Sequence, residues 1–169
     1  PSVFGGWARH IPEHVELFSL QLPARGARLS EAPVHEMHAL IDELVKAYKQ
    51  LGDDRPTSFF GHCFGALMMF ELTDRLRSEG LELPQNLFVS AARNPRSYTH
   101  EQLMADVEQF SPKPPLQLPQ LDDDMLVEAL KEMRFADSVD ALEKEEIRRL
   151  LLPAVRADFQ ISNTYFYEK

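Results

Sequence analysis

Residues 58–72 read SFFGHCFGALMMFEL, and this stretch decides the fold. A short apolar run leads into a Gly-x-Cys-x-Gly motif centred on Cys63, and a helix-like apolar stretch follows it. Strand, Gly-x-nucleophile-x-Gly and helix, in that order, are the context of a nucleophile elbow. Such a turn holds its nucleophile in a strained conformation above a sheet, and its glycines avoid collisions between strand and helix. The stretch therefore predicts an exposed Cys63 in an elbow formed with Gly61, His62 and Gly65.

The chemistry of a cysteine at this position follows from its place at the start of a helix. Unpaired N–H groups and the helix dipole favour the thiolate form there, and the thiolate is the reactive form of cysteine. The alternative is a small buried cysteine in a tight strand–helix turn, with no chemical role. The local context favours the elbow.

Composition excludes several classes of function. The chain has 169 residues and a net charge of −9, which argues against nucleic-acid binding. No segment approaches the apolar length of a membrane span, and no signal peptide is visible. The single cysteine excludes an internal disulfide and a cysteine-based metal cluster, and it fits a reducing, cytoplasmic environment. We expect no metal site, since the acidic run 122–124 is typical of a helix start.

The first half of the chain has an α/β pattern. We expect strands at 15–22, 58–60 and 86–91, with helices over 34–51 and from the elbow to about Glu79, where Gly80 is a plausible C-cap. Strands alternating with helices predict a parallel sheet.

The second half has no convincing strand. We expect helices at 99–110, from 122 to about 133, and at 139–165, with a proline-rich linker at 111–119. Pro153 should bend or divide the last of these helices. The chain is therefore predicted to be one domain, with an α/β core segment at 1–95 and a helical lid region at 96–169.

Several segments in addition to the elbow resemble one known family. They are QLPARGAR at 21–28, FGHCFGA at 60–66, LFVSA at 87–91 and PAVRADF at 153–159. Their order and spacing resemble the type II (editing) thioesterases of nonribosomal peptide and polyketide assembly lines, within the α/β-hydrolase superfamily. The resemblance implies an incomplete α/β-hydrolase-like parallel sheet with a helical lid insertion.

The resemblance also implies an activity and partners. Such enzymes hydrolyse acyl groups from the phosphopantetheine thiol of acyl or peptidyl carrier proteins, so the substrate brings the phosphopantetheine and no separate cofactor is expected. Cys63 would be the nucleophile, and the backbone N–H of Phe64 would be one oxyanion-hole donor. Members tend to be monomers, so we expect a monomer that binds no nucleic acid and no membrane.

Two departures from the family pattern matter. The family nucleophile is typically serine, and here it is Cys63. The family places its Asp and His after the lid and a Gly-rich oxyanion loop before the first matched residue, so we expect the chain to be truncated at both ends. A cysteine nucleophile would form an acyl-enzyme close in energy to the starting thioester. Acyl transfer to an amine or hydroxyl is therefore a hypothesis beside hydrolysis.

Other side chains receive weaker assignments. Arg25 and Arg28 are candidates for contact with a carrier protein or with the phosphopantetheine phosphate, although a structural role of the loop is favoured. Met68 is a possible acyl-pocket residue, although core packing is the commoner role. His62 should point away from the reacting face, and we assign no histidine a catalytic role. Arg156 and Asp158 lie two apart on a helix and do not face each other, so each needs another partner.

Two other functions stay open at this stage. One is a catalytically incomplete fragment or homologue that binds a carrier protein without turnover. The other is a cysteine-elbow hydrolase of small esters or lactones, as in dienelactone hydrolases, which the matches at 21–28 and 153–159 disfavour.

Overall fold

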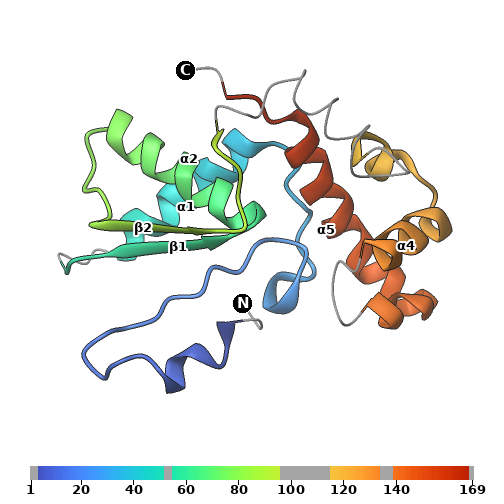
Figure 1. Ribbon diagram of the computed structural model, residues 1–169, viewed down its shortest axis with the longest axis horizontal. Coiled ribbons are helices and arrows are strands. Elements are labelled where there is room, and N and C mark those ends of the chain that lie inside the picture. The colour runs from blue at the N-terminus through green and yellow to red at the C-terminus, as the bar shows by residue number, and fades with distance from the viewer. Residues whose placement is uncertain (1–3, 52–54, 96–114, 134–138, 168–169) are drawn as a thin grey trace.

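The computed structural model describes residues 4–51, 55–95, 115–133 and 139–167, and the expected helix at 99–110 lies outside these ranges. An α/β part and a group of C-terminal helices lie side by side (Figure 1). The sequence prediction of an α/β fold with a parallel sheet is confirmed: β1 (Ser58–His62) and β2 (Asn86–Ser90) pair in parallel, with His62 opposite Ser90.

Two helices pack together beside this sheet. They are α1 (Met37–Leu51) and α2 (Phe64–Ser78). The apolar residues of α1 recur at helical spacing, so one face of it packs into a core cluster with α2 and Phe59 of β1. The chain leaves α2 through Gly80, whose φ of +67° allows the N–H of Leu81 to bond the carbonyl of Leu76 at 2.9 Å. The predicted glycine C-cap is confirmed.

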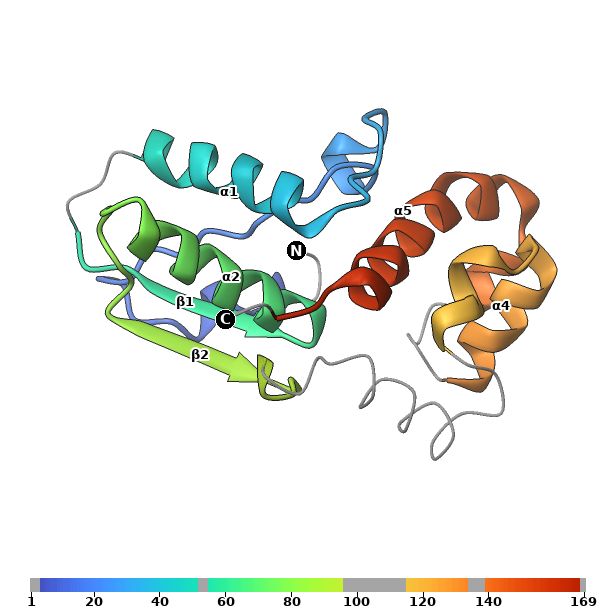
Figure 2. The same cartoon turned by 90° about the horizontal axis from the view of Figure 1, so that it is seen from above.

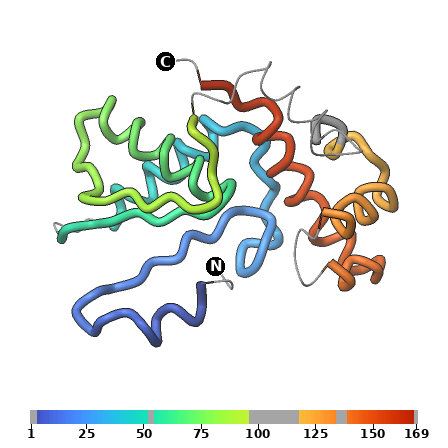
Figure 3. Tube along the Cα trace, viewed as in Figure 1, coloured from blue at the N-terminus to red at the C-terminus, as the bar shows by residue number. Residues whose placement is uncertain are grey.

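The segment expected as a strand at 15–22 differs from the prediction. It is extended but belongs to no sheet, because the described sheet consists of β1 and β2 only. The trace runs along the α/β part and turns back through residues 23–31 to reach α1 (Figure 3). An alternating apolar pattern forms a strand only when a neighbour offers ladder hydrogen bonds, and the described chain gives this segment none. Its side chains Val15, Phe18 and Leu20 are consequently exposed.

The C-terminal helices form a second cluster. They are η5 (Pro115–Gln120), α4 (Asp123–Glu132), η6 (Val139–Glu143) and α5 (Glu145–Thr164). Part of the expected proline-rich linker is thus a 3-10 helix. The predicted cap of α4 is present, since the side chain of Asp122 accepts from the N–H of Met125 at 2.8 Å.

Helix α5 joins the two clusters. Leu152 belongs to the buried cluster with α4 and η6, whereas Ile161, further along the same helix, belongs to the core cluster with α1 and α2. The helix is continuous through Pro153, so the proline does not divide it, and the other expected outcome, a bend, stays a prediction. The carboxyl ends of β1 and β2 point toward α5 (Figures 1 and 2).

Candidate functional site

The backbone at Cys63 has the conformation that an elbow requires. Cys63 follows β1 directly, precedes α2 and has φ 52° and ψ −120°, which non-glycine residues rarely adopt. The side chain is exposed. The interpretation of Cys63 as a buried structural cysteine is therefore wrong, and the thiol can be reached from solvent.

The two glycines of the elbow differ in what they do. A Cβ on Gly61 would lie 2.3 Å from the carbonyl oxygen of Gly65 and 2.5 Å from the Cα of Ala66. No side chain fits there, so Gly61 lets the strand and the helix approach closely. A Cβ on Gly65 meets nothing within 4 Å. Glycine is therefore sterically required at Gly61, as expected, whereas no described residue requires glycine at position 65.

Ser90 ties the elbow to the neighbouring strand. Its carbonyl accepts from the N–H of Cys63 at 2.8 Å, and its hydroxyl lies 3.1 Å from Nδ1 of His62. His62 is exposed and shares a sheet face with Phe60, whereas Phe59 and Gly61 face the opposite, buried side. The contact between His62 and Ser90 was missed at the sequence level, because it depends on the strand register.

The first turn of α2 supplies backbone donors next to the thiol. The amides of Ala66 and Leu67 bond the carbonyl of Cys63 at 3.0 and 3.4 Å. The amide of Phe64 has no acceptor among the described residues, as expected for the first residue of a helix. Within the part of the chain that the structure describes, the N–H of Phe64 is thus unbonded beside Cys63, where it can stabilise negative charge.

A small cavity of about 180 Å³ lies close to the elbow. It is lined from the start of α2, from β2 and from the loop after β2. Its wall is mostly apolar and consists of Ala66, Leu67, Phe70, Leu87, Val89, Ala92, Arg93 and Pro95. Met68, the suggested acyl-pocket residue, is 4% exposed and packs inside the core cluster instead. The apolar cavity near the start of α2 is thus lined by Leu67 and Phe70, and it begins at Ala66, directly after the elbow.

Arg25 and Arg28 both form ion pairs within the chain. Arg25 holds Asp158 of α5 through two hydrogen bonds of 2.7 and 2.9 Å. Arg28 bonds both carboxylate oxygens of Glu31 and the carbonyl of Gln21. Its hydrogen bonds lower the pKa of Glu31 and raise that of Arg28.

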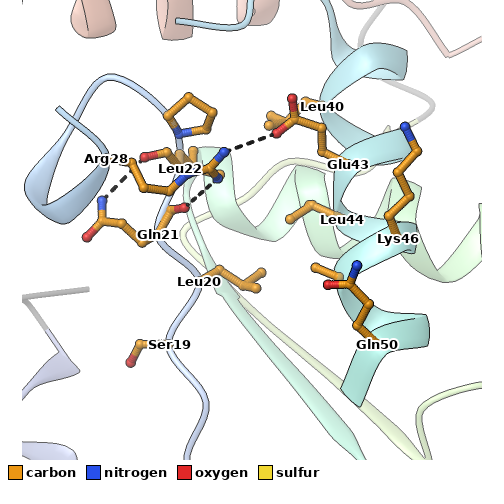
Figure 4. A pocket seen from close by; sticks show the side chains of 12 residues that line it. Ser19, Leu20, Gln21, Leu22, Arg28, Leu40, Glu43, Leu44, Lys46 and Gln50 are labelled. Atoms are coloured by element: carbon orange, nitrogen blue, oxygen red, sulfur yellow. Dashed lines mark hydrogen bonds and ion pairs between the residues drawn. The ribbon is translucent and has the colours of Figure 1, made fainter. Parts of the chain in front are cut away.

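Arg28 also lines a larger cavity, of about 350 Å³, between residues 19–23 and α1 (Figure 4). Glu43 and Lys46 of α1 face this space, and Glu43 lies 3.6 Å from the guanidinium of Arg28. None of the elbow residues lines it. This cavity is consequently separate from the site around Cys63.

The expectation that Arg156 and Asp158 need separate partners is confirmed. Asp158 pairs with Arg25, and Arg156 bonds the carbonyls of Pro119 and Leu121 and the carboxylate of Asp123. Arg156 thereby fastens α5 to η5 and to the start of α4. The sequence predicted that these two charged residues do not pair with each other, but it could not identify their partners, which lie more than 30 residues away along the chain.

Other predicted features add nothing to the site. His10, His14, His35 and His38 are exposed, and His100 lies outside the described residues. In residues 4–51, 55–95, 115–133 and 139–167, no group of three or more potential metal-ligating side chains comes together. No helix in these same ranges is long and apolar enough to cross a membrane.

Comparison with protein families and curated proteins gives concordant results. A family model described as thioesterase domain matches residues 1–167. The chain is 28% identical over 167 residues to the gramicidin S biosynthesis protein GrsT of Aneurinibacillus migulanus, covering 99% of this chain and 59% of that protein. It is 33% identical over 158 residues to a probable cadicidin biosynthesis thioesterase of Streptomyces griseus, covering 94% and 38%.

Solved structures agree with this comparison. RedJ, a thioesterase from the prodiginine biosynthetic pathway in Streptomyces coelicolor, matches with a TM-score of 0.79 and 29% identity, over 99% of this chain and 57% of RedJ. The type II thioesterase BorB from the borrelidin biosynthetic cluster matches with a TM-score of 0.75 and 28% identity, over 99% and 62%. The chain thus spans little more than half the length of most of these relatives.

Proposed function

Because the chain belongs to the thioesterase domain family, we propose that the protein hydrolyses acyl groups from the phosphopantetheine thioesters of carrier proteins, through an acyl-Cys63 intermediate. The observation that carries the proposal is the backbone of Cys63, strained at φ 52° and ψ −120° in an exposed turn above Gly61. Strained conformations of this kind persist where they position reactive groups.

The reaction has two steps. The thiolate of Cys63 attacks the thioester carbonyl, the bond from carbon to the pantetheine sulfur breaks, and the pantetheine leaves as a thiol after taking up a proton. Water then attacks the acyl-cysteine, which releases the carboxylic acid and restores the thiol. The N–H of Phe64 donates to the oxyanion that forms in each step. The cavity beside Leu67 and Phe70 receives the start of the acyl chain.

The C-terminal helices serve as a lid in this proposal. The carboxyl edge of the sheet carries Cys63 and faces α5 (Figure 2), so a substrate reaches the thiol between these two parts. The relatives named for gramicidin S and cadicidin biosynthesis support substrates held on assembly-line carrier proteins. An acyl or peptidyl carrier protein is therefore the proposed partner.

The single cysteine makes the intermediate directly observable. Incubation with an octanoyl-pantetheine thioester should increase the intact mass of the chain by one octanoyl group, and peptide mapping should place this group on Cys63. The adduct should accumulate, since an acyl-cysteine is itself a thioester and its hydrolysis needs an activated water. Absence of any adduct, combined with saturable binding of the carrier protein, would favour the alternative of binding without turnover.

Two variants complete this experiment. Cys63→Ala removes the nucleophile and should abolish the adduct, while the neighbouring variant Ser90→Ala keeps the thiol and should retain it. Cys63→Ser tests hydrolysis against transfer: with an added amine acceptor, the cysteine form should give a larger share of amide than the serine form. Identical product shares would contradict the transfer hypothesis.

A further inference from the structure

The attachment of α5 to the α/β part depends on a small set of side chains from segments distant in sequence. Asp158 pairs with Arg25, Gln160 lies 3.1 Å from Nδ1 of His35, and Ile161 enters the core cluster. Tyr165, just after the helix, bonds Glu71 of α2. Among these contacts the pair between Arg25 and Asp158 alone combines charge with two parallel hydrogen bonds, a geometry that fixes orientation as well as distance.

The loop that carries Arg25 is held by hydrogen bonds within itself. Ala24 is buried with φ 61°, and its N–H bonds the carbonyl of Arg28 at 3.0 Å. The Nε of Arg25 bonds the carbonyl of Pro23, which orients the guanidinium within its own loop. Because these bonds do not involve Asp158, they restrict the guanidinium of Arg25 independently of the pair, which reduces the side-chain entropy lost on pairing.

The pair is also better shielded than the other ion pairs of α5. The side chains of Arg25 and Asp158 are 28% and 24% exposed, whereas those of Arg149 and Glu145 on the same helix are 76% and 72% exposed. Exposed pairs contribute little, and partial burial with bidentate geometry increases the contribution. The partial burial and the bidentate geometry of Asp158 are therefore those of a residue that fixes the position of α5, and they differ from those of a solvated surface charge.

The segment that follows the anchored helix contacts a residue of the small cavity near the elbow. The helix lies beside the carboxyl edge of the sheet in both views (Figures 1 and 2). Beyond its C-terminus, Tyr167 packs against Phe70 with ring centroids 5.8 Å apart, and Phe70 lines the cavity near Cys63. A shift of α5 would thus disturb the packing of Phe70, one residue of the cavity wall.

We propose that Arg25 is a positioning residue: through Asp158 it fixes α5 and, by way of Tyr167, the place of Phe70 in the wall of the cavity near the start of α2. The consequence for catalysis rests on the proposed thioesterase function, while the anchoring itself does not. The guanidinium of Arg25 is used inside the protein, so we assign it to substrate fit rather than to contact with a carrier protein.

The test compares Asp158→Asn with the charge-reversed pair Arg25→Asp/Asp158→Arg. In Asp158→Asn, amide hydrogen exchange in residues 156–164 should rise about fivefold or more, while exchange in α1 and α2 stays as in the parent. The KM for an octanoyl thioester should rise by a similar factor, with kcat changed less than about twofold and the KM for an acetyl thioester unchanged. The charge-reversed pair should bring both the hydrogen exchange and the KM for the octanoyl thioester most of the way back to the parent values.

Arg149→Gln is the matched control, since it breaks an ion pair on the solvent side of the same helix. It should change neither the hydrogen exchange in residues 156–164 nor the ratio of the KM for the octanoyl thioester to that for the acetyl thioester. The proposal is overturned if Asp158→Asn behaves like this control. It is also overturned if exchange rises throughout the chain and both thioesters lose kcat equally, because that pattern indicates a general loss of stability. Should the parent not turn over any thioester, the proposed function fails, and the exchange experiment still decides whether Arg25 anchors α5.

Discussion

At the scale of single residues, the elbow assigns different tasks to two glycines that look equivalent in the sequence. The motif predicted both, yet a Cβ on Gly61 would collide with backbone atoms of Gly65 and Ala66, whereas Gly65 has open space. A pattern records which residue types occur, and only coordinates reveal which atoms approach. The same holds for Asp158, whose need for a partner was visible in the sequence and whose pairing with Arg25 was not.

This difference between the glycines gives a direct prediction. Gly61→Ala should lower the free energy of unfolding by about 2–3 kcal/mol, because the obstructing atoms belong to the backbone and cannot rotate away. Gly65→Ala is the matched control and should be neutral or stabilising by up to about 0.5 kcal/mol, since alanine favours the helix. Urea unfolding followed by circular dichroism measures both. Equal midpoints for the two variants would show that the close approach at Gly61 is absent in solution.

At the scale of elements, local signals were sufficient where an element is stabilised by its own sequence. The glycine at position 80 and the aspartate at position 122 predicted a helix end and a helix start, and both are present. The segment 15–22 was mispredicted because a strand needs a partner, and alternation of residues says nothing about whether one is there. Pro153 does not divide α5, since packing of the buried Leu152 and Ala154 on either side keeps the chain helical despite the lost hydrogen bond.

The proline in α5 therefore carries a cost that a substitution should reveal. Pro153→Ala restores an N–H donor within the helix and should raise the free energy of unfolding by about 1–2 kcal/mol, after allowance for the more flexible unfolded chain. Pro153→Gly restores the same donor without helix propensity and should gain about 1 kcal/mol less. Thermal or urea unfolding of the parent, Pro153→Ala and Pro153→Gly measures these differences in the free energy of unfolding. A loss of stability in Pro153→Ala would mean that the proline ring contributes packing that outweighs the missing bond.

At the scale of the whole molecule, two buried clusters are joined by α5, and a considerable apolar surface stays uncovered. Phe88 and Val89 of β2 are 56% and 58% exposed, and Phe18 of the extended segment is 54% exposed. Exposed apolar side chains are unfavourable in water, and contiguous apolar patches are rare on soluble monomers. Family membership follows from motifs scattered over the whole chain, so it could be predicted from the sequence. The exposed surface could not, because it depends on which strands lie next to each other.

The exposed surface leads to a prediction for the 169-residue chain expressed alone. It should bind the dye ANS and unfold over a broad temperature range, because apolar groups already in contact with water add little to the cooperativity of unfolding. Phe88→Thr keeps a residue that favours strands and should reduce ANS fluorescence and aggregation on heating. Leu150→Gln removes a side chain that is 48% exposed on α5, away from the sheet, and should have a much smaller effect. A sharp cooperative melt at high temperature without ANS binding would contradict the prediction, since it would require these side chains to be covered in solution.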